Sequence, residues 1–193
     1  MDKIILRKNV LKTRDELLRE DQLSLSYEIM EKTVGHYEFM QAEEVLLYAS
    51  YKSEVITDGI MEYAFMLGKK VYCPKVITNG VQSEMEFFQI LSKEDLKEGY
   101  KGIKEPETIQ DRKFIPFLKK AILIMPGAVF DKCGHRIGYG KGFYDRFLHG
   151  KEDSFQCKIA LAYDFQVQEE IPYESHDVCA DIIITEKDII DCM

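Results

Sequence analysis

Short apolar runs alternate along the chain with segments of helical length. The clearest runs are EEVLLYAS (43–50), VYCPKV (71–76), EMEFFQI (84–90), AILIMPG (121–127), KIALAYD (158–164) and ADIIITE (180–186). Strands buried on both faces have nearly uninterrupted apolar runs, whereas strands with one solvent-exposed face alternate between apolar and polar residues. The pattern therefore predicts an α/β fold: an open, Rossmann-like, three-layer arrangement with helices on both faces of a largely parallel sheet.

Helical spacing dominates the first forty residues. Leu11, Arg14, Leu17 and Leu18 recur at intervals of three and four, which indicates one helix. Asp21 is a candidate cap for a second amphipathic helix, whose predicted apolar positions are Leu23, Tyr27, Met30, Val34 and Tyr37. We therefore expect two helices before the first strand.

Capping residues mark two further helical segments. Thr57 is a candidate N-cap for the helix in TDGIMEYAFMLGKK, and Gly68 is a candidate for the first position after it. Ser92 begins SKEDLKEG, which reads as a short capped turn.

The length and composition indicate one domain. A chain of 193 residues that is 46% hydrophobic can bury roughly 70% of its unfolded surface in a single core. No repeat, low-complexity tract or proline-rich linker interrupts it. We expect residues 1–193 to form a single domain.

The charge limits the classes of partner. The formal net charge is −8, which argues against general affinity for nucleic acid or an acidic membrane surface. An anionic ligand must therefore meet locally concentrated positive charge. The charged N-terminal segment offers no signal peptide or membrane span. No CxxC pair is present, so we expect reduced thiols in a cytoplasmic protein at the five cysteines, 73, 133, 157, 179 and 192.

The stretch GHRIGYGKGFYDRF (134–147) is the strongest candidate for a ligand site. It follows the apolar run 121–127, and ligands of open α/β sheets bind beyond the carboxyl ends of strands. Glycines 138, 140 and 142 allow positive φ angles and close approach to main-chain N–H groups, and a helix can begin at Phe143.

Charged residues in the same stretch suit a phosphate. Arg136, Lys141 and Arg146 can neutralise phosphate oxygens, and Asp145 can hold Mg²⁺. The stretch lacks the glycine–lysine–Ser/Thr ending of a P-loop, and Phe143 stands where a dinucleotide fingerprint needs glycine. The residues alone leave a nucleotide site, a sugar-phosphate site and a structural glycine turn open.

A longer segment, MPGAVFDKCGHRIGYGKGFYDRFL (125–148), resembles the signature of the 5-formyltetrahydrofolate cyclo-ligases, also called methenyltetrahydrofolate synthetases. The remaining family segments follow in the same order: KIILR, SEVIT, CPKV, MEFF, GIKEP and FQVQEEIPYESHDVCADIIITE. The resemblance implies a C–N bond-forming ligase of one-carbon metabolism. Its reaction is the ATP-dependent closure of 5-formyltetrahydrofolate to 5,10-methenyltetrahydrofolate, with release of ADP and phosphate and with Mg²⁺ as helper.

The resemblance also implies an ATP site formed by two segments. Its residues are Lys3, Ile4, Ile5, Leu6, Arg7, Arg136, Ile137, Gly138, Tyr139, Gly140, Lys141, Gly142, Phe143 and Tyr144. The alternative for the N-terminal basic pair is a solvated helix end. Lysine and glycine both occur in the family at the position of Lys141, so we expect an added phosphate contact there.

A folate site overlaps the ATP loop in this resemblance. The implied residues are Ala49, Glu54, Tyr139, Gly140, Lys141, Gly142 and Phe143. The Glu54 carboxylate would accept hydrogen bonds from the amino and ring N–H groups of the pterin. Phe143 replaces a tyrosine that is frequent in the family and keeps the aromatic face. Met85 and Phe87 are either part of an apolar wall for the folate or ordinary core residues.

Two aspartates match the magnesium-associated carboxylates of the family, Asp145 and Asp177. Helix capping is the alternative for Asp145, and an ordinary loop position is the alternative for Asp177. His135 and His176 lack a partner at metal-ligand spacing, so we interpret them as polar neighbours of the site.

Two other functional classes compete with the ligase. One is a binding module that holds folate or nucleotide without turnover, and the other is a sugar-phosphate isomerase or acyl-CoA-handling enzyme. The joint presence of the basic residues and both aspartates favours catalysis. We expect the partners to be 5-formyltetrahydrofolate and ATP, and the protein to be a monomer or weak homodimer.

Overall fold

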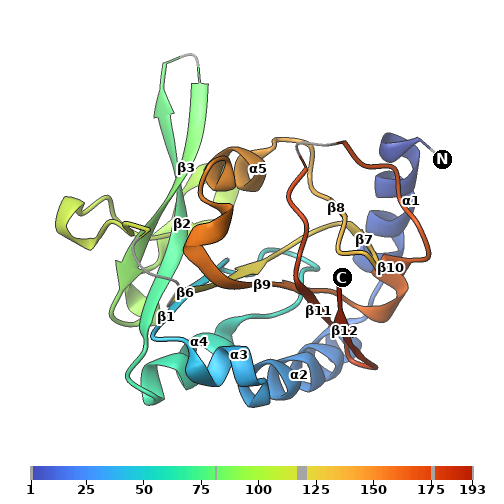
Figure 1. Ribbon diagram of the computed structural model, residues 1–193, viewed down its shortest axis with the longest axis horizontal. Coiled ribbons are helices and arrows are strands. Elements are labelled where there is room, and N and C mark those ends of the chain that lie inside the picture. The colour runs from blue at the N-terminus through green and yellow to red at the C-terminus, as the bar shows by residue number, and fades with distance from the viewer. Residues whose placement is uncertain (1, 81, 117–120, 175–176, 193) are drawn as a thin grey trace.

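The computed structural model describes residues 2–80, 82–116, 121–174 and 177–192. Its centre is a seven-stranded sheet (Figure 1). The helices are α1 (Lys3–Asp15), α2 (Arg19–Gly35), α3 (Tyr37–Gln41), α4 (Asp58–Met66) and α5 (Phe143–Leu148). Short 3₁₀ turns occur at Lys93–Asp95, Tyr100–Gly102, Gln110–Arg112, Glu152–Ser154 and Asp164–Gln166.

The main sheet has the strand order β12-β11-β9-β6-β1-β2-β3. Its strands are β1 (Glu44–Leu47), β2 (Lys70–Asn79), β3 (Gln82–Ile90), β6 (Ala121–Met125), β9 (Phe155–Leu161), β11 (Ile182–Ile184) and β12 (Ile189–Asp191). All pairs from β11 to β2 are parallel, and the edge strands β3 and β12 pair antiparallel. The predicted open, largely parallel α/β sheet is confirmed.

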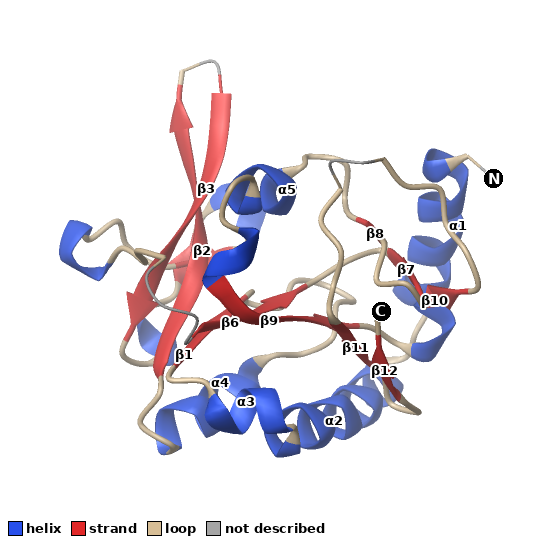
Figure 2. Cartoon of the chain, viewed as in Figure 1, coloured by secondary structure: helices blue, strands red, loops and turns tan. Residues whose placement is uncertain are grey.

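Both faces of this sheet are buried, which explains the continuous apolar runs. Within β1, Val45 and Leu47 join one core cluster, whereas Leu46 between them joins the other. Helices α2, α3 and α4 lie along one face of the sheet, and α5 lies on the opposite face (Figure 2). The second helical layer is therefore much thinner than the first.

A smaller sheet supports α1. Strands β7 (Val129–Asp131), β8 (Arg136–Ile137) and β10 (Val167–Gln168) form it, with β7 in the middle. Leu6 and Val10, one helical turn apart, pack in a separate apolar cluster with Val129 and Ile137. This cluster fixes α1 beside the segment that leads into the glycine stretch (Figure 1).

The two N-terminal helices are confirmed, but the predicted cap and buried face of α2 are wrong. Leu18 is the N-cap of α2, and Asp21 lies inside the first turn. Of the predicted apolar positions, Met30 and Val34 pack against the core, whereas Leu23, Tyr27 and Tyr37 are exposed. The buried face is partly polar because Gln22 and Ser26 hold the turn around Glu54; Gln22 Nε2 donates to the Glu54 carbonyl oxygen (2.8 Å).

The other predicted helix ends are confirmed in position. Thr57 is the N-cap of α4, although its hydroxyl donates to the carbonyl oxygen of Tyr48 and makes no capping bond. Gly68 follows α4 with φ +70°, the left-handed conformation expected of a glycine at this point. Ser92 precedes the 3₁₀ turn Lys93–Asp95.

The hairpin of β2 and β3 extends beyond the rest of the sheet (Figure 1). Pro74 is tolerated within β2 because the pairing of β2 with β1 ends at Tyr72, so that edge is open at Pro74. A two-stranded sheet of β4 (Lys97–Glu98) and β5 (Lys104–Glu105) lies beside β2.

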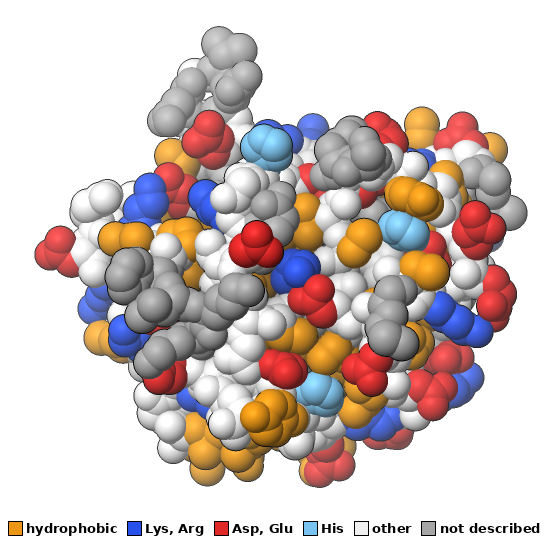
Figure 3. Space-filling view, in the orientation of Figure 1, with side chains coloured by type: hydrophobic (Ala, Val, Ile, Leu, Met, Phe, Trp, Pro, Cys, Tyr) orange, Lys and Arg blue, Asp and Glu red, His pale blue; other side chains and the backbone are white. Residues whose placement is uncertain are grey.

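The surface agrees with the composition. Acidic and basic side chains are intermixed over the face seen in Figure 3. The five cysteines are free thiols, as predicted. Among the described residues, the helices are too short or too polar to cross a membrane.

Candidate active site

The candidate site lies beyond the carboxyl ends of β1 and β6. The turn after β1 carries Ala49 and Glu54, and the segment after β6 leads through β7 and β8 into the glycine loop, defined here as Gly138–Gly142. Helix α1 contacts the loop from a third direction. The structure thus brings together three segments that the resemblance assigned to one site.

The glycine loop needs its glycines for two different reasons. Gly140 and Gly142 have φ angles of +87° and +61°, as predicted. Gly138 does not have a positive φ angle, and a Cβ there would lie 2.8 Å from Nη1 of Arg136. The requirement at Gly138 is therefore space for a buried guanidinium.

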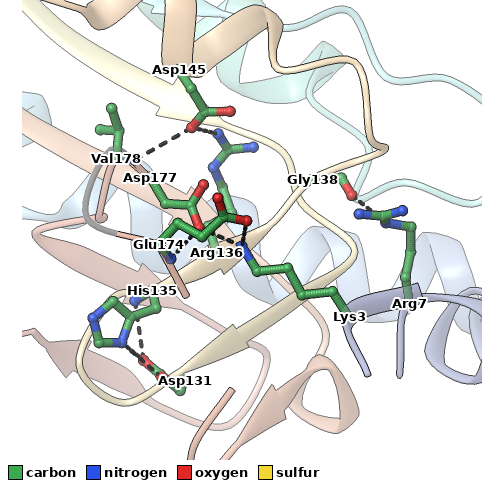
Figure 4. A network of polar contacts seen from close by, with 10 residues as sticks. All are labelled: Lys3, Arg7, Asp131, His135, Arg136, Gly138, Asp145, Glu174, Asp177 and Val178. Atoms are coloured by element: carbon green, nitrogen blue, oxygen red, sulfur yellow. Dashed lines mark hydrogen bonds and ion pairs between the residues drawn. The ribbon is translucent and has the colours of Figure 1, made fainter. Parts of the chain in front are cut away.

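Arg136 and Asp145 form the centre of the polar side of the loop (Figure 4). The side chain of Arg136 is 4% exposed, and its Nη2 donates to Oδ1 of Asp145 (2.9 Å). The same oxygen accepts the N–H of Val178 (3.3 Å). Asp145 lies in the first turn of α5, whose N-cap is Gly142, so its position also suits the helix dipole.

Helix α1 contributes two cations to this side of the loop (Figure 4). Lys3 Nζ donates to Oδ2 of Asp177 (2.7 Å) and to Oε1 of Glu174 (3.1 Å). Arg7 Nε donates to the carbonyl oxygen of Gly138 (2.7 Å). The alternative of a solvated basic helix end is therefore wrong.

Several other residues predicted for the ATP site are either buried in an apolar cluster or exposed to solvent. Leu6 and Ile137 are buried in the apolar cluster under α1. Ile4 and Ile5 are 67% and 54% exposed, and Lys141 is also exposed. Within Lys3–Arg7, Arg7 contacts the loop itself, at Gly138, whereas Lys3 contacts Asp177 beside it.

A carboxylate dominates the other side of the loop. Glu54 is half-buried, and its Oε2 accepts the N–H of Tyr51 (2.9 Å). Burial raises the pKa of Glu54, while hydrogen bonds from Tyr139 and Tyr51 and the charge of Arg14 oppose the rise. Ala49 is buried in the core at the start of the same turn.

Tyr139 connects the glycine loop with Glu54. Its hydroxyl accepts a hydrogen bond from Arg14 Nη1 (2.7 Å) and lies close enough to the Glu54 carboxylate for each group to shift the pKa of the other. Burial and the charge of Glu54 hold the pKa of Tyr139 well above its usual value, against the effect of Arg14. The hydroxyl stays protonated, so it donates its proton toward Glu54.

Aromatic rings border the loop where it enters α5. The ring of Tyr100 meets Phe143 edge to face, with centroids 6.2 Å apart. Phe87 is 1% exposed and packs against Phe147, at 4.8 Å between centroids. Of the two alternatives for Met85 and Phe87, burial favours ordinary core residues.

Two buried polar atoms of the same region lack a hydrogen-bond partner among the described residues: Arg136 Nε and the hydroxyl of Tyr144. The Arg136 guanidinium lies over the Tyr144 ring, 5.4 Å from its centroid. An unsatisfied buried donor is costly, which indicates that a ligand or water completes this part of the site.

The carboxylates suit Mg²⁺ only as part of a larger coordination shell. Asp145 and Asp177 approach each other because Val178, the neighbour of Asp177, donates to Asp145. In the described parts of the chain, no group of three His, Cys, Asp or Glu residues is placed to hold a metal. Two hard oxygen ligands fit a Mg²⁺ ion whose other ligands are phosphate oxygens and waters.

His135 is a polar neighbour of the site, as interpreted from the sequence. Its Nδ1 lies 2.9 Å from Oδ2 of Asp131, and its ring stacks on Tyr173 at 3.7 Å between centroids. His176 lies outside the described residues.

Sequence reasoning missed the buried position of Arg14 at the loop. It placed this residue only on a helical repeat, but the side chain is buried and reaches Tyr139. The signal was its distance from Lys3 and Arg7, eleven and seven residues, which puts all three cations on one face of α1.

The fold and the site define an α/β protein with a glycine loop beyond the carboxyl ends of its strands, bordered by buried and partly buried basic side chains. The family model of the 5-formyltetrahydrofolate cyclo-ligase family matches residues 1–186. The chain therefore belongs to the 5-formyltetrahydrofolate cyclo-ligase family.

Individual relatives agree with this assignment. The 5-formyltetrahydrofolate cyclo-ligase of Haemophilus influenzae is 30% identical over 173 residues, which cover 90% of this chain and 91% of the relative. That of Escherichia coli K12 is 27% identical, covering 89% and 93%. The solved structure of 5,10-methenyltetrahydrofolate synthetase from Aquifex aeolicus has a TM-score of 0.83 and 31% identity, covering 100% of this chain and 93% of its own. These similarities favour the ligase over the isomerase and binding-module alternatives.

Proposed function

We propose that the chain carries out the reaction of its family at the glycine loop, with the phosphates of ATP on the Arg136 side and the folate on the Glu54 side. The reaction is the ATP-dependent closure of 5-formyltetrahydrofolate to 5,10-methenyltetrahydrofolate. Family membership supports the reaction, and the geometry of the loop supports the site.

One observation carries the assignment of the two sides. Arg136 and Tyr139 are three residues apart, yet they have different partners: Arg136 contacts Asp145, whereas Tyr139 contacts Arg14 and Glu54. A substrate bound at each side would bring a phosphate and a folate together at the loop. This juxtaposition is what a phosphoryl transfer between two substrates requires.

The chemistry proceeds in two steps. The formyl oxygen forms a bond to the γ-phosphorus of ATP, and the bond between that phosphorus and the oxygen of ADP breaks. The N10 lone pair then attacks the formyl carbon, phosphate departs with the electrons of the C–O bond, and N10 loses its proton. Phosphorylation is needed because a formamide oxygen is a poor leaving group.

Cations on the polar side stabilise the transferring phosphoryl group. Lys3, Arg7 and Arg136 are close enough to the loop to donate to phosphate oxygens after exchanging some of their present contacts. The unpartnered Nε of Arg136 offers a donor that needs no such exchange. Lys141 adds charge from the exposed side.

Glu54 orients the folate. Its carboxylate accepts N–H groups of the pterin, and Tyr139 and Phe143 provide aromatic surface along the loop. Ala49 lies at the start of the turn that carries Glu54, where a larger side chain would disturb the packed core.

Mg²⁺ would be held by Asp145 and Asp177, and it would neutralise charge on the phosphates. Both carboxylates are hydrogen-bonded to cations, Asp145 to Arg136 and Asp177 to Lys3, so a bound Mg²⁺ would share or replace these contacts. The two side chains also anchor the carboxylates near the loop beforehand.

The direct test is the absorbance of the methenyl product. The protein is mixed with 5-formyltetrahydrofolate and Mg-ATP, and matched reactions contain a non-hydrolysable ATP analogue or a chelator. We expect product only with ATP, and less of it with the chelator. Correctly folded protein that gives no ATP-dependent absorbance would contradict the proposed reaction.

The setting of this reaction stays a prediction. We propose a single domain spanning residues 1–193 that works in the cytoplasm as a monomer or weak homodimer. Sedimentation of the purified protein with and without substrates would test the oligomeric state.

A further inference from the structure

Arg14 is a buried cation at the folate side of the loop. The residue is 4% exposed, and it lies on α1 in line with Lys3 and Arg7. Its guanidinium lies over the Tyr139 ring, 5.4 Å from the centroid, while Nη1 donates to the hydroxyl of the same residue (2.7 Å). One side chain thus fixes both the ring and the hydroxyl of Tyr139.

The same guanidinium binds the two neighbouring segments. Nε donates to Oγ of Ser53 (3.1 Å), in the turn that carries Glu54, and Nη1 also donates to the carbonyl oxygen of Gly127 (3.3 Å), just after β6. Arg14 therefore joins three segments that leave separate elements: the Glu54 turn, the end of β6 and the glycine loop.

These acceptors are uncharged, which makes the position unusual. A buried cation is costly unless hydrogen bonds or an opposite charge compensate it. The compensating charge comes from Glu54, which acts on Arg14 electrostatically and is connected to it through the Tyr139 hydroxyl. Arg14 therefore holds the Tyr139 hydroxyl by a hydrogen bond and the Glu54 turn through Ser53, and the Tyr139 hydroxyl lies beside the Glu54 carboxylate.

We propose that Arg14 is a positioning residue for the folate: it holds the Tyr139 hydroxyl against Glu54 and thereby fixes the carboxylate that receives the pterin. This inference rests on the proposed function, because it takes the pocket beside Glu54 as the folate site. Arg14 acts through Tyr139 and Glu54 and is not itself a catalytic residue.

Helix α1 provides an internal comparison. Its first two turns carry Lys3 and Arg7, which we place on the phosphate side, and its last turn carries Arg14. A substitution that merely displaced the helix would weaken the use of both substrates. A substitution that removes only the positioning contact would weaken the use of folate alone.

The test is a kinetic comparison of Arg14→Met, Tyr139→Phe and the double variant, with thermal unfolding measured for each. Lys8→Met is the matched control, since Lys8 is exposed on the same helix and the change in charge is the same. We expect Arg14→Met to raise the KM for 5-formyltetrahydrofolate about 10- to 100-fold, the range for a lost hydrogen bond to a charged group. The KM for ATP should change less than about 3-fold, within the context-dependence of a distant site.

Two further results are expected. The double variant should raise the folate KM by clearly less than the product of the single effects, because both substitutions break the same contact. Arg14→Lys, which keeps the charge but lacks the planar set of donors, should give an intermediate folate KM.

Each contrary outcome has a distinct meaning. The positioning role would be overturned if the folate KM stayed unchanged in Arg14→Met and Tyr139→Phe, or if the KM values for ATP and folate rose equally. In either case, a raised folate KM in Glu54→Gln would still support the proposed folate pocket. An unchanged folate KM in Glu54→Gln as well would overturn the proposed folate site and, with it, the role of Arg14. If Arg14→Met did not fold, Tyr139→Phe and Arg14→Lys would decide the question.

Discussion

The two sides of the glycine loop, which we propose to bind the phosphates and the folate, differ in their chemistry. On the phosphate side, Arg136 and Lys3 are already paired with Asp145 and Asp177. On the folate side, Glu54 faces a tyrosine hydroxyl, with the charge of Arg14 behind it. Phosphates bring their own charge and can replace carboxylates at a cation, whereas a neutral pterin needs an acceptor that is already in place. Exchangeable ion pairs therefore suit the first side, and a fixed network anchored on the buried Arg14 suits the second.

The largest effect should come from the phosphate side. Asp145→Asn removes a proposed metal ligand and the charge that faces Arg136. We expect kcat to fall about 100-fold or more, because metal-assisted charge stabilisation is worth several kcal/mol. The KM for ATP should change less than kcat, and the dependence on Mg²⁺ should weaken. Initial rates across a range of Mg²⁺ concentrations measure all three quantities.

Asp153→Asn is the matched control, since this aspartate lies in an exposed turn after α5. It should keep the wild-type dependence on Mg²⁺. Full activity of Asp145→Asn at every Mg²⁺ concentration would show that Asp145 holds no metal, and the contrast between the two sides would lose its basis.

The folate side should respond in KM. Glu54→Gln replaces a charged acceptor by a neutral one, so we expect the KM for 5-formyltetrahydrofolate to rise about 10- to 100-fold, equivalent to about 1.5–3 kcal/mol. The KM for ATP should stay near that of the wild type. Glu28→Gln makes the same change at an exposed position of α2. Equal increases in both KM values for Glu54→Gln would contradict separate sides.

Although Glu54→Gln should weaken folate binding, it should increase the stability of the folded protein. Burial raises the pKa of Glu54 above the usual 4.5, so the folded state favours the protonated carboxyl and ionisation at higher pH destabilises it. The cost of burying the Glu54 carboxylate thus exceeds its attraction to Arg14, so Glu54→Gln should unfold at a higher temperature than the wild type at pH 7. The difference should shrink as the pH falls toward and below 4.5. Thermal unfolding of both proteins between about pH 4 and pH 8, a range that includes the shifted pKa, tests this prediction. A variant that is less stable than the wild type at pH 7 would contradict it.

The fold was predictable because its central strands are buried on both faces, as the runs around Val45 and Ile122 show. The buried face of α2 was not, since Gln22 and Ser26 are buried for their hydrogen bonds to a distant turn. The spacing of apolar residues does not show which polar backbone groups of a distant turn need a hydrogen-bond partner from the helix.

In the site, too, local features were predictable from the sequence, whereas contacts between distant segments were not. Local chemistry pointed to the glycine loop, including the positive φ angles of Gly140 and Gly142. The pairing of Arg136 with Asp145 and the contact of Arg14 with Tyr139 depend on how separate segments fold together. The spacing of Arg14 from Lys3 and Arg7 indicates a shared helix face, but neither contact partner follows from a period in the sequence, so only the structure revealed the contacts.

The smallest effect should come from Lys141. Its side chain is exposed, and its carbonyl oxygen accepts a hydrogen bond from Arg146 (2.7 Å) that a substitution would leave in place. Solvent and salt screen an exposed charge, so Lys141→Ala should raise the KM for ATP no more than about 5-fold, the equivalent of about 1 kcal/mol. The effect should shrink further at high salt. Arg136→Lys is the useful comparison, because its guanidinium is buried and stacked on Tyr144. We expect this variant to raise the KM for ATP more than Lys141→Ala at every salt concentration. If the order were reversed, the exposed lysine would be the principal phosphate ligand, and the phosphate side would depend on its surface charge instead of its buried cation.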